Sequence, residues 1–366
     1  MMKLFPILAA ATLCASGAFA AGGDWPQLGF DAKGRRENTH ETVLTRKTVK
    51  NLKPAWSVAL AANTPAMVAN GVAYVAANDS LYAFDAATGA SIWQVPLGGT
   101  SLAPPAVADG TVYVPANNRM IALDAESGRL LWSMIAGNGG IESAPAVKGG
   151  TVYFGNDDGH YYAVNAKTGV VRWSYATGLH GIAAAPSVGG GMAYFADSSG
   201  TLDAFDAGSG ALKWSATIEA SYYVGGTVYD GGTVYGVTRR GLYAFDAATG
   251  AARWLVGMGE NDSAMALAKG HIHMATTDQI LWDFDAATGA LDSADWVGTS
   301  MQSTPAVASG VVYVGSMSST ISAYDARTSA LLWQASTAGS VFAAPTISNG
   351  RLYVADGHTL TAYGLE

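Results

Sequence analysis

Cysteine, charge and long apolar runs are all scarce in this 366-residue chain. The only cysteine is Cys14, so no disulfide can form within the chain and core burial must hold the fold together. Charged residues make up 13% of the sequence, with 20 basic and 28 acidic residues and a net charge of −8. This acidic balance argues against a nucleic-acid or anionic-membrane partner, because neither would be attracted electrostatically. After residue 20, no apolar run is long enough to form a transmembrane segment.

The first twenty residues differ in character from the rest of the chain. A basic start at Lys3 precedes a mostly apolar stretch over residues 4–13, and Ala18 and Ala20 give a small-residue cleavage site before Ala21. This pattern is typical of a secretory signal peptide, and it is too short for a membrane anchor. The alternative is a buried N-terminal helix. The pattern therefore predicts a signal peptide over residues 1–20, a mature chain that begins near Ala21, and a periplasmic or secreted protein.

The alternative processing of such a signal sequence is lipidation at Cys14. A lipoprotein signal needs small residues immediately before the cysteine, whereas Leu13 precedes Cys14. The leader therefore favours cleavage, which would leave a mature chain with no cysteine and one fewer positive charge.

One sequence unit recurs through the chain with a period near 40 residues. Its clearest form, LYAFDAATG followed by a tryptophan, spans residues 81–93 and again 242–254. A period of about 40–45 residues is typical of four-stranded propeller blades. The first Asp of the unit, or Asn in one copy, recurs at Asp85, Asp124, Asn165, Asp206, Asp246, Asp285 and Asp325. The tryptophan recurs at Trp93, Trp132, Trp173, Trp214, Trp254 and Trp333.

Residues 145–173 show how one unit can form one blade. Short β-branched and aromatic runs at residues 144–147, 151–154, 161–164 and 170–173 read as strands. Turn sequences rich in Gly, Asn and Asp separate them. The unit therefore predicts four short antiparallel strands, and stacked units would bury both faces of each sheet.

The recurring Asp and Trp positions have a structural explanation. A turn carboxylate can accept hydrogen bonds from N–H groups two or three residues further on, and the glycine of the turn supplies a positive φ. A tryptophan on the outer strand supplies apolar surface between neighbouring blades. We therefore interpret these residues as turn and docking residues, not as ligands.

The two chain ends complement each other. The unit that begins at Pro345 ends after its third strand, while residues 55–60 around Trp56 form a fourth strand with no first three before it. Pairing these segments would close a ring and remove its exposed edges. The sequence thus predicts an all-β, monomeric, eight-bladed β-propeller of four-stranded antiparallel blades, closed by an N-terminal strand that joins the C-terminal blade. The expected domains are residues 1–20, the signal peptide; 21–51, an N-terminal lead-in; and 52–366, a single propeller. Its inner strands are expected to begin near Pro65, Pro105, Pro145, Pro186, Thr227, Met265, Pro305 and Pro345.

The Ala-x-Asp-x-x-Thr-Gly units and their tryptophans resemble the pyrroloquinoline-quinone-like (PQQ-like) eight-bladed propeller family. The resemblance runs from about Trp25 to the C-terminus and includes the opening DWPQLG and NLKPAW segments. It implies one of two kinds of protein. Quinoprotein dehydrogenases of the family bind PQQ and a calcium ion in the central funnel, whereas non-catalytic members include the scaffold subunit of the outer-membrane protein assembly machine.

The chain departs from both kinds of relative. The dehydrogenases carry a vicinal disulfide beside the quinone, longer loops and, in some, a Cys-x-x-Cys-His haem motif, none of which this sequence has. The assembly scaffold is a lipoprotein, and this leader lacks a lipoprotein signal. We therefore expect an exported binding or scaffold module without catalytic chemistry, whose partner is an envelope protein or polymer. The alternative is a minimal PQQ- and calcium-dependent quinoprotein dehydrogenase.

Strand alternation assigns the turns to two faces of the propeller. The face formed by the third-to-fourth-strand turns is monotonous, whereas the opposite face varies from unit to unit, and specific function usually resides in such loops. Three positions before each inner-strand start on this variable face, most residues are apolar, and Glu142, Asp262 and Gln302 are the polar exceptions. They could bind a hard cation through oxygen ligands, with Glu142 and Asp262 as calcium ligands in the quinoprotein alternative, or they could simply line a wet channel. The candidate ligand-binding residues are Glu142, His180, Arg239, Asn261, Asp262 and Gln302; solvated turns would explain His180 and Arg239 equally well.

The sixth unit is the least regular. His273 stands where other units have tyrosine, and Trp296 is displaced relative to the other outer-strand tryptophans. His271 and His273 lie on one side of a strand, a spacing that can bind metal. A third ligand is not evident from sequence, and a structural histidine pair is the alternative, so no firm metal site is predicted.

Overall fold

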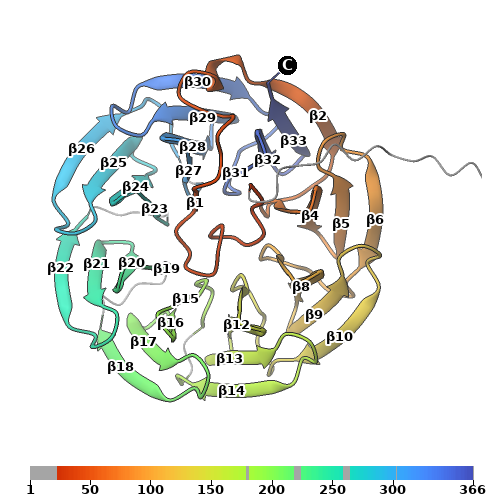
Figure 1. Ribbon diagram of the computed structural model, residues 1–366, viewed down its shortest axis with the longest axis vertical. Coiled ribbons are helices and arrows are strands. Elements are labelled where there is room, and N and C mark those ends of the chain that lie inside the picture. The colour runs from red at the N-terminus through yellow and green to blue at the C-terminus, as the bar shows by residue number, and fades with distance from the viewer. Residues whose placement is uncertain (1–22, 179–180, 218–223, 259–263, 302, 366) are drawn as a thin grey trace, which may run out of the picture.

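The computed structural model describes residues 23–178, 181–217, 224–258, 264–301 and 303–365. Eight sheets surround a central channel, as the propeller prediction required (Figure 1). We number the blades in chain order. From the inner to the outer strand, the first four are blade 1, β3 (Met67–Ala69), β4 (Val72–Ala77), β5 (Ser80–Asp85) and β6 (Ser91–Pro96); blade 2, β7 (Ala106–Ala108), β8 (Thr111–Ala116), β9 (Arg119–Asp124) and β10 (Leu130–Ile135); blade 3, β11 (Ala146–Lys148), β12 (Thr151–Asn156), β13 (His160–Asn165) and β14 (Val171–Ala176); and blade 4, β15 (Ser187–Gly189), β16 (Met192–Ala196), β17 (Thr201–Asp206) and β18 (Leu212–Thr217).

The second half of the chain continues the pattern. It forms blade 5, β19 (Val224–Asp230), β20 (Thr233–Thr238), β21 (Gly241–Asp246) and β22 (Ala252–Gly257); blade 6, β23 (Ala266–Ala268), β24 (His271–Ala275), β25 (Ile280–Asp285) and β26 (Leu291–Trp296); blade 7, β27 (Ala306–Ala308), β28 (Val311–Ser316), β29 (Thr320–Asp325) and β30 (Leu331–Ser336); and blade 8, β31 (Thr346–Ser348), β32 (Arg351–Ala355), β33 (Thr359–Gly364) and β2 (Lys53–Ala59). The short strand β1 (Glu37–Asn38) adds to β27, and a 3₁₀ turn, η1 (Val49–Asn51), precedes β2. No helix within these described ranges is long and apolar enough to cross a membrane.

The turn chemistry follows the prediction from the repeat. Between β3 and β4, Asn70 and Gly71 both have positive φ, the conformation that a tight two-residue hairpin needs. Between β5 and β6, one carboxylate oxygen of Asp85 accepts hydrogen bonds from the backbone N–H and the hydroxyl of Thr88, both at 2.8 Å. Gly89 then takes a φ of 73°. The Asp-x-x-Thr-Gly sequence is therefore a turn motif, as expected.

At six of the eight blade interfaces, aromatic side chains join one blade to the next through a single backbone carbonyl. Trp93 and Tyr74 of blade 1 both donate to the carbonyl oxygen of Ala125 in blade 2, at 3.2 and 3.0 Å. The same pairing recurs around the ring with Trp132 and Tyr113 to Ala166, Trp173 and Tyr153 to Ala207, Trp214 and Tyr194 to Ala247, Trp254 and Tyr235 to Ala286, and Trp56 and Tyr353 to Ala86. Trp333 of blade 7 instead donates to the carbonyl oxygen of Leu52, at 3.1 Å.

The ring closes by pairing the two ends of the chain. The antiparallel partner of β33 is β2, with Trp56 opposite Ala362 and Val58 opposite Leu360. Figure 1 shows these strands side by side, with β2 in orange outside β33 in dark blue. The predicted closure is confirmed, and it gives blade 8 the same four-stranded form as its neighbours.

The N-terminal lead-in lies inside the ring. Residues 24–38, which we call the plug segment, wind around the channel in the centre of Figure 1 and form hydrogen bonds with the inner strand of each blade in turn. The contacts to blades 1 to 8 in order are Trp25 to Val68, Pro26 to Val107, Gln27 to Val147, Ala32 to Val188, Lys33 to Tyr229, Arg35 to Leu267, Arg36 to Val307 and Asn38 to Ile347. The plug segment therefore satisfies inner-strand backbone groups that would otherwise face the open channel.

Close approach of backbones explains the glycines of the plug segment. A Cβ on Gly34, whose φ is 79°, would lie 2.7 Å from the carbonyl oxygen of Thr227. A Cβ on Gly29 would lie 2.3 Å from the Cα of Gly34. The segment can turn tightly inside the channel only because both positions lack a side chain.

Candidate binding site at the channel mouth

A cavity of about 570 Å³ opens on the variable face, where the connections into the inner strands meet. Its floor includes Leu28 and Arg36 of the plug segment, and its wall includes Glu142, Asp157 and Asp197. The channel is therefore closed from below by the chain's own N-terminal segment and is accessible at its mouth.

The mouth of the cavity is chemically polarised. Leu102, in the connection from β6 to β7, is 64% exposed, and Phe342, in the connection from β30 to β31, is 46% exposed. Glu142, in the connection from β10 to β11, and Asp157, in the hairpin between β12 and β13, place carboxylates on the side of blade 3. Apolar side chains and carboxylates thus share one rim.

Local hydrogen bonds hold the acidic side in place. The Asn156 side chain donates to the carbonyl oxygen of Gly139 at 3.0 Å, and the backbone N–H of Asp157 donates to that of Gly140 at 2.9 Å. These bonds join the loop that carries Glu142 to the hairpin that carries Asp157. The hydroxyl of Ser143 donates to the carbonyl oxygen of Ala184 at 3.0 Å and ties the same loop to blade 4.

Burial raises the pKa values of Glu142 and Asp157. Desolvation, and then the charge of Asp157, raise the pKa of Glu142 above its ordinary value. Desolvation, and then the charge of Asp158, raise the pKa of Asp157. A positive charge placed near Glu142 and Asp157 would stabilise their ionised forms and lower their pKa values.

Asp197 differs from these two carboxylates although it lines the same wall. It is 2% exposed, and its Oδ1 accepts hydrogen bonds from the N–H of Ser199 at 2.9 Å and from the N–H of Thr201 at 3.1 Å. The carboxylate therefore holds the hairpin between β16 and β17 in shape. Its role in the site is to support the wall.

The structure brings together part of the predicted site. Glu142 lines the cavity, as do Leu102, Ala183 and Phe342 from the same predicted ring of positions. Arg239 lies half-buried in the hairpin between β20 and β21 and is not among the described residues that line the cavity. His180, Asn261, Asp262 and Gln302 lie outside the described residues.

Sequence reasoning did not identify Asp157, Arg36 or Asp197 as cavity residues. Asp157 and Asp197 were available as acidic positions in second-to-third-strand hairpins of the variable face. The position of Arg36 had no sequence signal, because the plug segment carries no repeat.

The comparisons with known proteins identify the family. The family model described as outer membrane protein assembly factor BamB matches residues 77–294 and 290–365. The chain belongs to this family. No curated protein sequence matches the chain significantly.

Solved structures share the fold of this BamB-type, PQQ-like propeller at low sequence identity. BamB from Moraxella catarrhalis aligns with a TM-score of 0.74 and 16% identity over 86% of this chain and 99% of that chain. The quinohemoprotein alcohol dehydrogenase from Comamonas testosteroni gives a TM-score of 0.80 and 17% identity over 94% and 81% of the two chains. A europium-containing methanol dehydrogenase gives 0.82 and 15% over 94% and 99%. These likenesses establish the propeller fold, which both scaffold and dehydrogenase structures share.

The described lining of the cavity does not fit a quinone cofactor. Glu142 and Asp157 could contribute oxygen ligands to a calcium ion. A planar quinone, however, needs a flat aromatic support, and Leu28 and Arg36 lie at the floor. Phe342 is the one aromatic side chain among the described lining residues, and it lies at the exposed mouth.

Proposed function

We propose that this protein is an exported binding module that binds an envelope protein at the channel mouth and catalyses no reaction there. The observation that carries the proposal is the floored cavity with exposed Leu102 and Phe342 on its rim beside Glu142 and Asp157. Exposed apolar side chains around a concave centre are typical of protein-binding sites. The family description, outer membrane protein assembly factor, supports a protein partner in the envelope.

The chemistry of the rim specifies what the partner presents. Leu102 and Phe342 would lose exposed apolar surface on binding, so a matching segment carries an apolar side chain. Glu142 and Asp157 favour a basic side chain next to that apolar side chain. Its positive charge would stabilise the ionised form of both carboxylates, whose pKa values are raised in the free protein. A loop of a protein with adjacent apolar and basic residues fits both requirements.

Site-specific photocrosslinking in cells tests the proposal. A crosslinker at Phe342 should capture a defined envelope protein, whereas one at Leu130, an exposed leucine at the start of β10 near the opposite face, should not. With the captured partner purified, Leu102→Asp and Phe342→Asp should each weaken binding at least about tenfold, an effect of roughly 1.4 kcal/mol. Leu130→Asp should leave the affinity unchanged.

Two results would overturn the proposal. One is an identical crosslinking pattern at positions 342 and 130. The other is PQQ- and calcium-dependent dye reduction by the purified protein, which would establish the quinoprotein alternative. The proposed export is tested separately by N-terminal sequencing of the periplasmic or secreted protein, which should begin near Ala21.

A further inference from the structure

The interface between blades 6 and 7 departs from the aromatic docking used elsewhere in the ring. Where the other blades have tyrosine, blade 6 has His273, and where they have alanine on the third strand, it has Asp283. Opposite Asp283, at the register position of the outer-strand tryptophan, stands Ser293. Blade 6 therefore lacks both aromatic groups that would dock onto blade 7.

Blade 7 carries the complementary change. In blades 1 to 6, the glycine of the Asp-x-x-x-Gly turn packs against the tryptophan of the preceding blade, as Gly250 does against Trp214 at a would-be Cβ distance of 2.7 Å. In blade 7 the same turn position is Ser329, with a φ of 52°. The glycine is missing where the neighbouring tryptophan is missing, so the two changes belong to one altered interface.

Polar groups and a cavity replace the aromatic packing. A cavity of about 400 Å³ lies here, lined by His271, His273, Asp283 and Asp292 from blade 6 and by Ala326 and Arg327 from blade 7. His273 and Ser293 are smaller than the tyrosine and tryptophan that occupy these positions in other blades. The replacement therefore leaves space beside a set of metal-ligating side chains.

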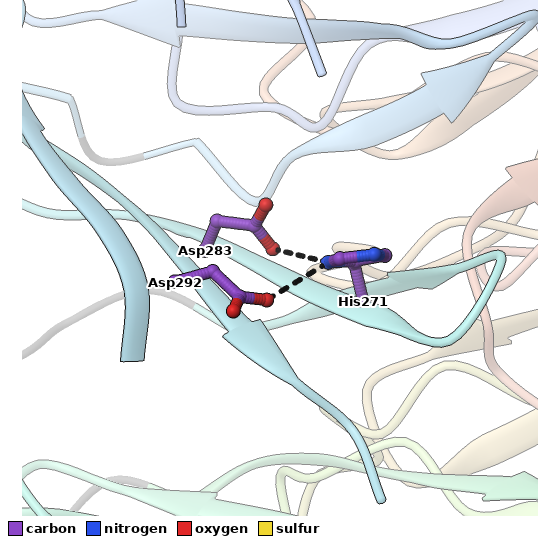
Figure 2. A group of neighbouring side chains, drawn as sticks. All are labelled: His271, Asp283 and Asp292. Carbon is purple, nitrogen blue, oxygen red and sulfur yellow. Dashed lines mark hydrogen bonds and ion pairs between the residues drawn. The ribbon is translucent and has the colours of Figure 1, made fainter. Parts of the chain in front are cut away.

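Three of these side chains converge on one point (Figure 2). The Nδ1 atom of His271 lies 3.2 Å from Oδ1 of Asp283 and 3.2 Å from Oδ2 of Asp292. One ligand atom from each residue lies within 4.8 Å of the others. They come from three adjacent strands, β24, β25 and β26, so the sheet itself fixes their spacing.

His273 backs this group from the buried side. It is 3% exposed, its ring stacks on that of His271 with centroids 6.3 Å apart, and its Nδ1 lies 3.7 Å from Oδ1 of Asp283. Arg46, Lys269 and Arg327 lie among the other lining residues and offset part of the negative charge around the cavity.

We propose that the interface between blades 6 and 7 binds a divalent transition-metal ion of the zinc type, with His271, Asp283 and Asp292 as ligands and solvent in the fourth position. Metal–ligand bonds of about 2 Å in a tetrahedral site place ligand atoms about 3.3 Å apart, close to the spacing found here. The imidazole nitrogen selects zinc-like ions over calcium, which prefers oxygen ligands alone. The ion would occupy space that aromatic side chains fill at other blade interfaces, and it would join three strands of blade 6.

Calorimetric titration of the chelator-treated full chain with zinc chloride tests the proposal. We expect saturable binding of one zinc ion per chain, a rise in melting temperature on zinc addition, and visible absorption bands when cobalt replaces zinc. Calcium chloride should give no such heat. His271→Gln and Asp292→Asn should each weaken zinc binding at least about tenfold.

Two further variants make the test specific. Asp283→Ala restores the residue that the other blades have at this position, so it should fold well and lose the site. His160→Ala removes a two-residue pair, His160 with Asp158 at 3.0 Å on the variable face, and should leave zinc binding intact. Absence of saturable zinc binding, or equal binding by the wild type and Asp283→Ala, would overturn the proposal.

Discussion

At the scale of single residues, one backbone carbonyl in each of blades 1 to 6 receives the aromatic donors of the preceding blade. The carbonyl oxygen of Ala247 accepts hydrogen bonds from Trp214 at 3.0 Å and from Tyr194 at 3.1 Å, and both donors belong to the preceding blade. Each aromatic side chain thereby buries a large apolar surface and also satisfies its polar atom. Replacing such a residue should therefore remove both the buried apolar surface and the hydrogen bond, and should lower the free energy of unfolding.

Substitution of Trp214 measures this contribution. Trp214 is 9% exposed, so Trp214→Ala should lower the free energy of unfolding by about 3–5 kcal/mol through the cavity that it leaves. Trp296 is 73% exposed, and Trp296→Ala should change the free energy of unfolding by less than about 0.5 kcal/mol. Urea denaturation followed by fluorescence gives both values. Equal losses in the two variants would contradict the docking role of Trp214.

The carboxyl groups of the channel mouth give a pH-dependent prediction. The pKa of Glu142 is raised in the folded chain, mainly by burial and next by Asp157. Its contribution to stability is therefore full below its unfolded pKa of about 4.5 and is lost as pH rises through the folded pKa. Glu142→Gln should raise the melting temperature at pH 7, on the order of 1 °C, and have little effect at pH 4.

Melting curves of the Glu142→Gln variant and the wild type across pH 4 to 8 make the measurement. Glu126→Gln provides the control, since Glu126 is an exposed acidic residue of a turn on the opposite face. A difference that is the same at every pH, or that is larger at pH 4, would contradict the raised pKa.

At the scale of elements, the plug segment is the part that the sequence could not predict. The repeats predicted the strands and turns of the blades because the same sequence pattern recurs in every unit, so that each copy supports the assignment of the others. Residues 24–38 occur once, contain one two-residue strand, and bond to partners up to 309 residues away. Likewise, the two carboxylates that join His271 in blade 6, Asp283 and Asp292, come from neighbouring strands, whose register is visible only once the sheet is folded.

Gln27 tests the energetic value of the plug segment. Its side chain accepts a hydrogen bond from the N–H of Val147 at 2.7 Å and donates to the carbonyl oxygen of the same residue at 3.2 Å. Gln27→Ala would leave both buried groups without this partner and should cost about 1–3 kcal/mol of unfolding free energy. The matched control is Gln94→Ala, which removes one exposed hydrogen bond to Tyr82 and should cost less than about 0.5 kcal/mol. Similar values for the two variants would show that the plug segment adds little stability.

At the scale of the whole molecule, the N-terminal region supplies two separate closures. Strand β2 covers the outer edge of β33, and the plug segment covers the inner strands of all eight blades. A chain that begins at residue 61 would expose β33 and the inner strands together. Unpaired strand edges recruit other chains, so this truncated protein should self-associate.

Light scattering coupled to size-exclusion chromatography distinguishes the outcomes. A chain that begins at residue 21 keeps both closures and should elute as a monomer. A monomeric chain from residue 61 with an unchanged melting temperature would contradict the importance of both closures.

The path of the plug segment also sets the order in which this protein can be completed. Its last partner, Ile347, lies 309 residues after Asn38, and the partner strand of β2, Thr359–Gly364, follows Ile347 in the chain. The plug segment and β2 are therefore synthesised before the strands that complete their pairing, and contacts of such long sequence separation form slowly. The ring can therefore close only after the strands of blade 8 have been synthesised, which makes its completion a single late event in folding.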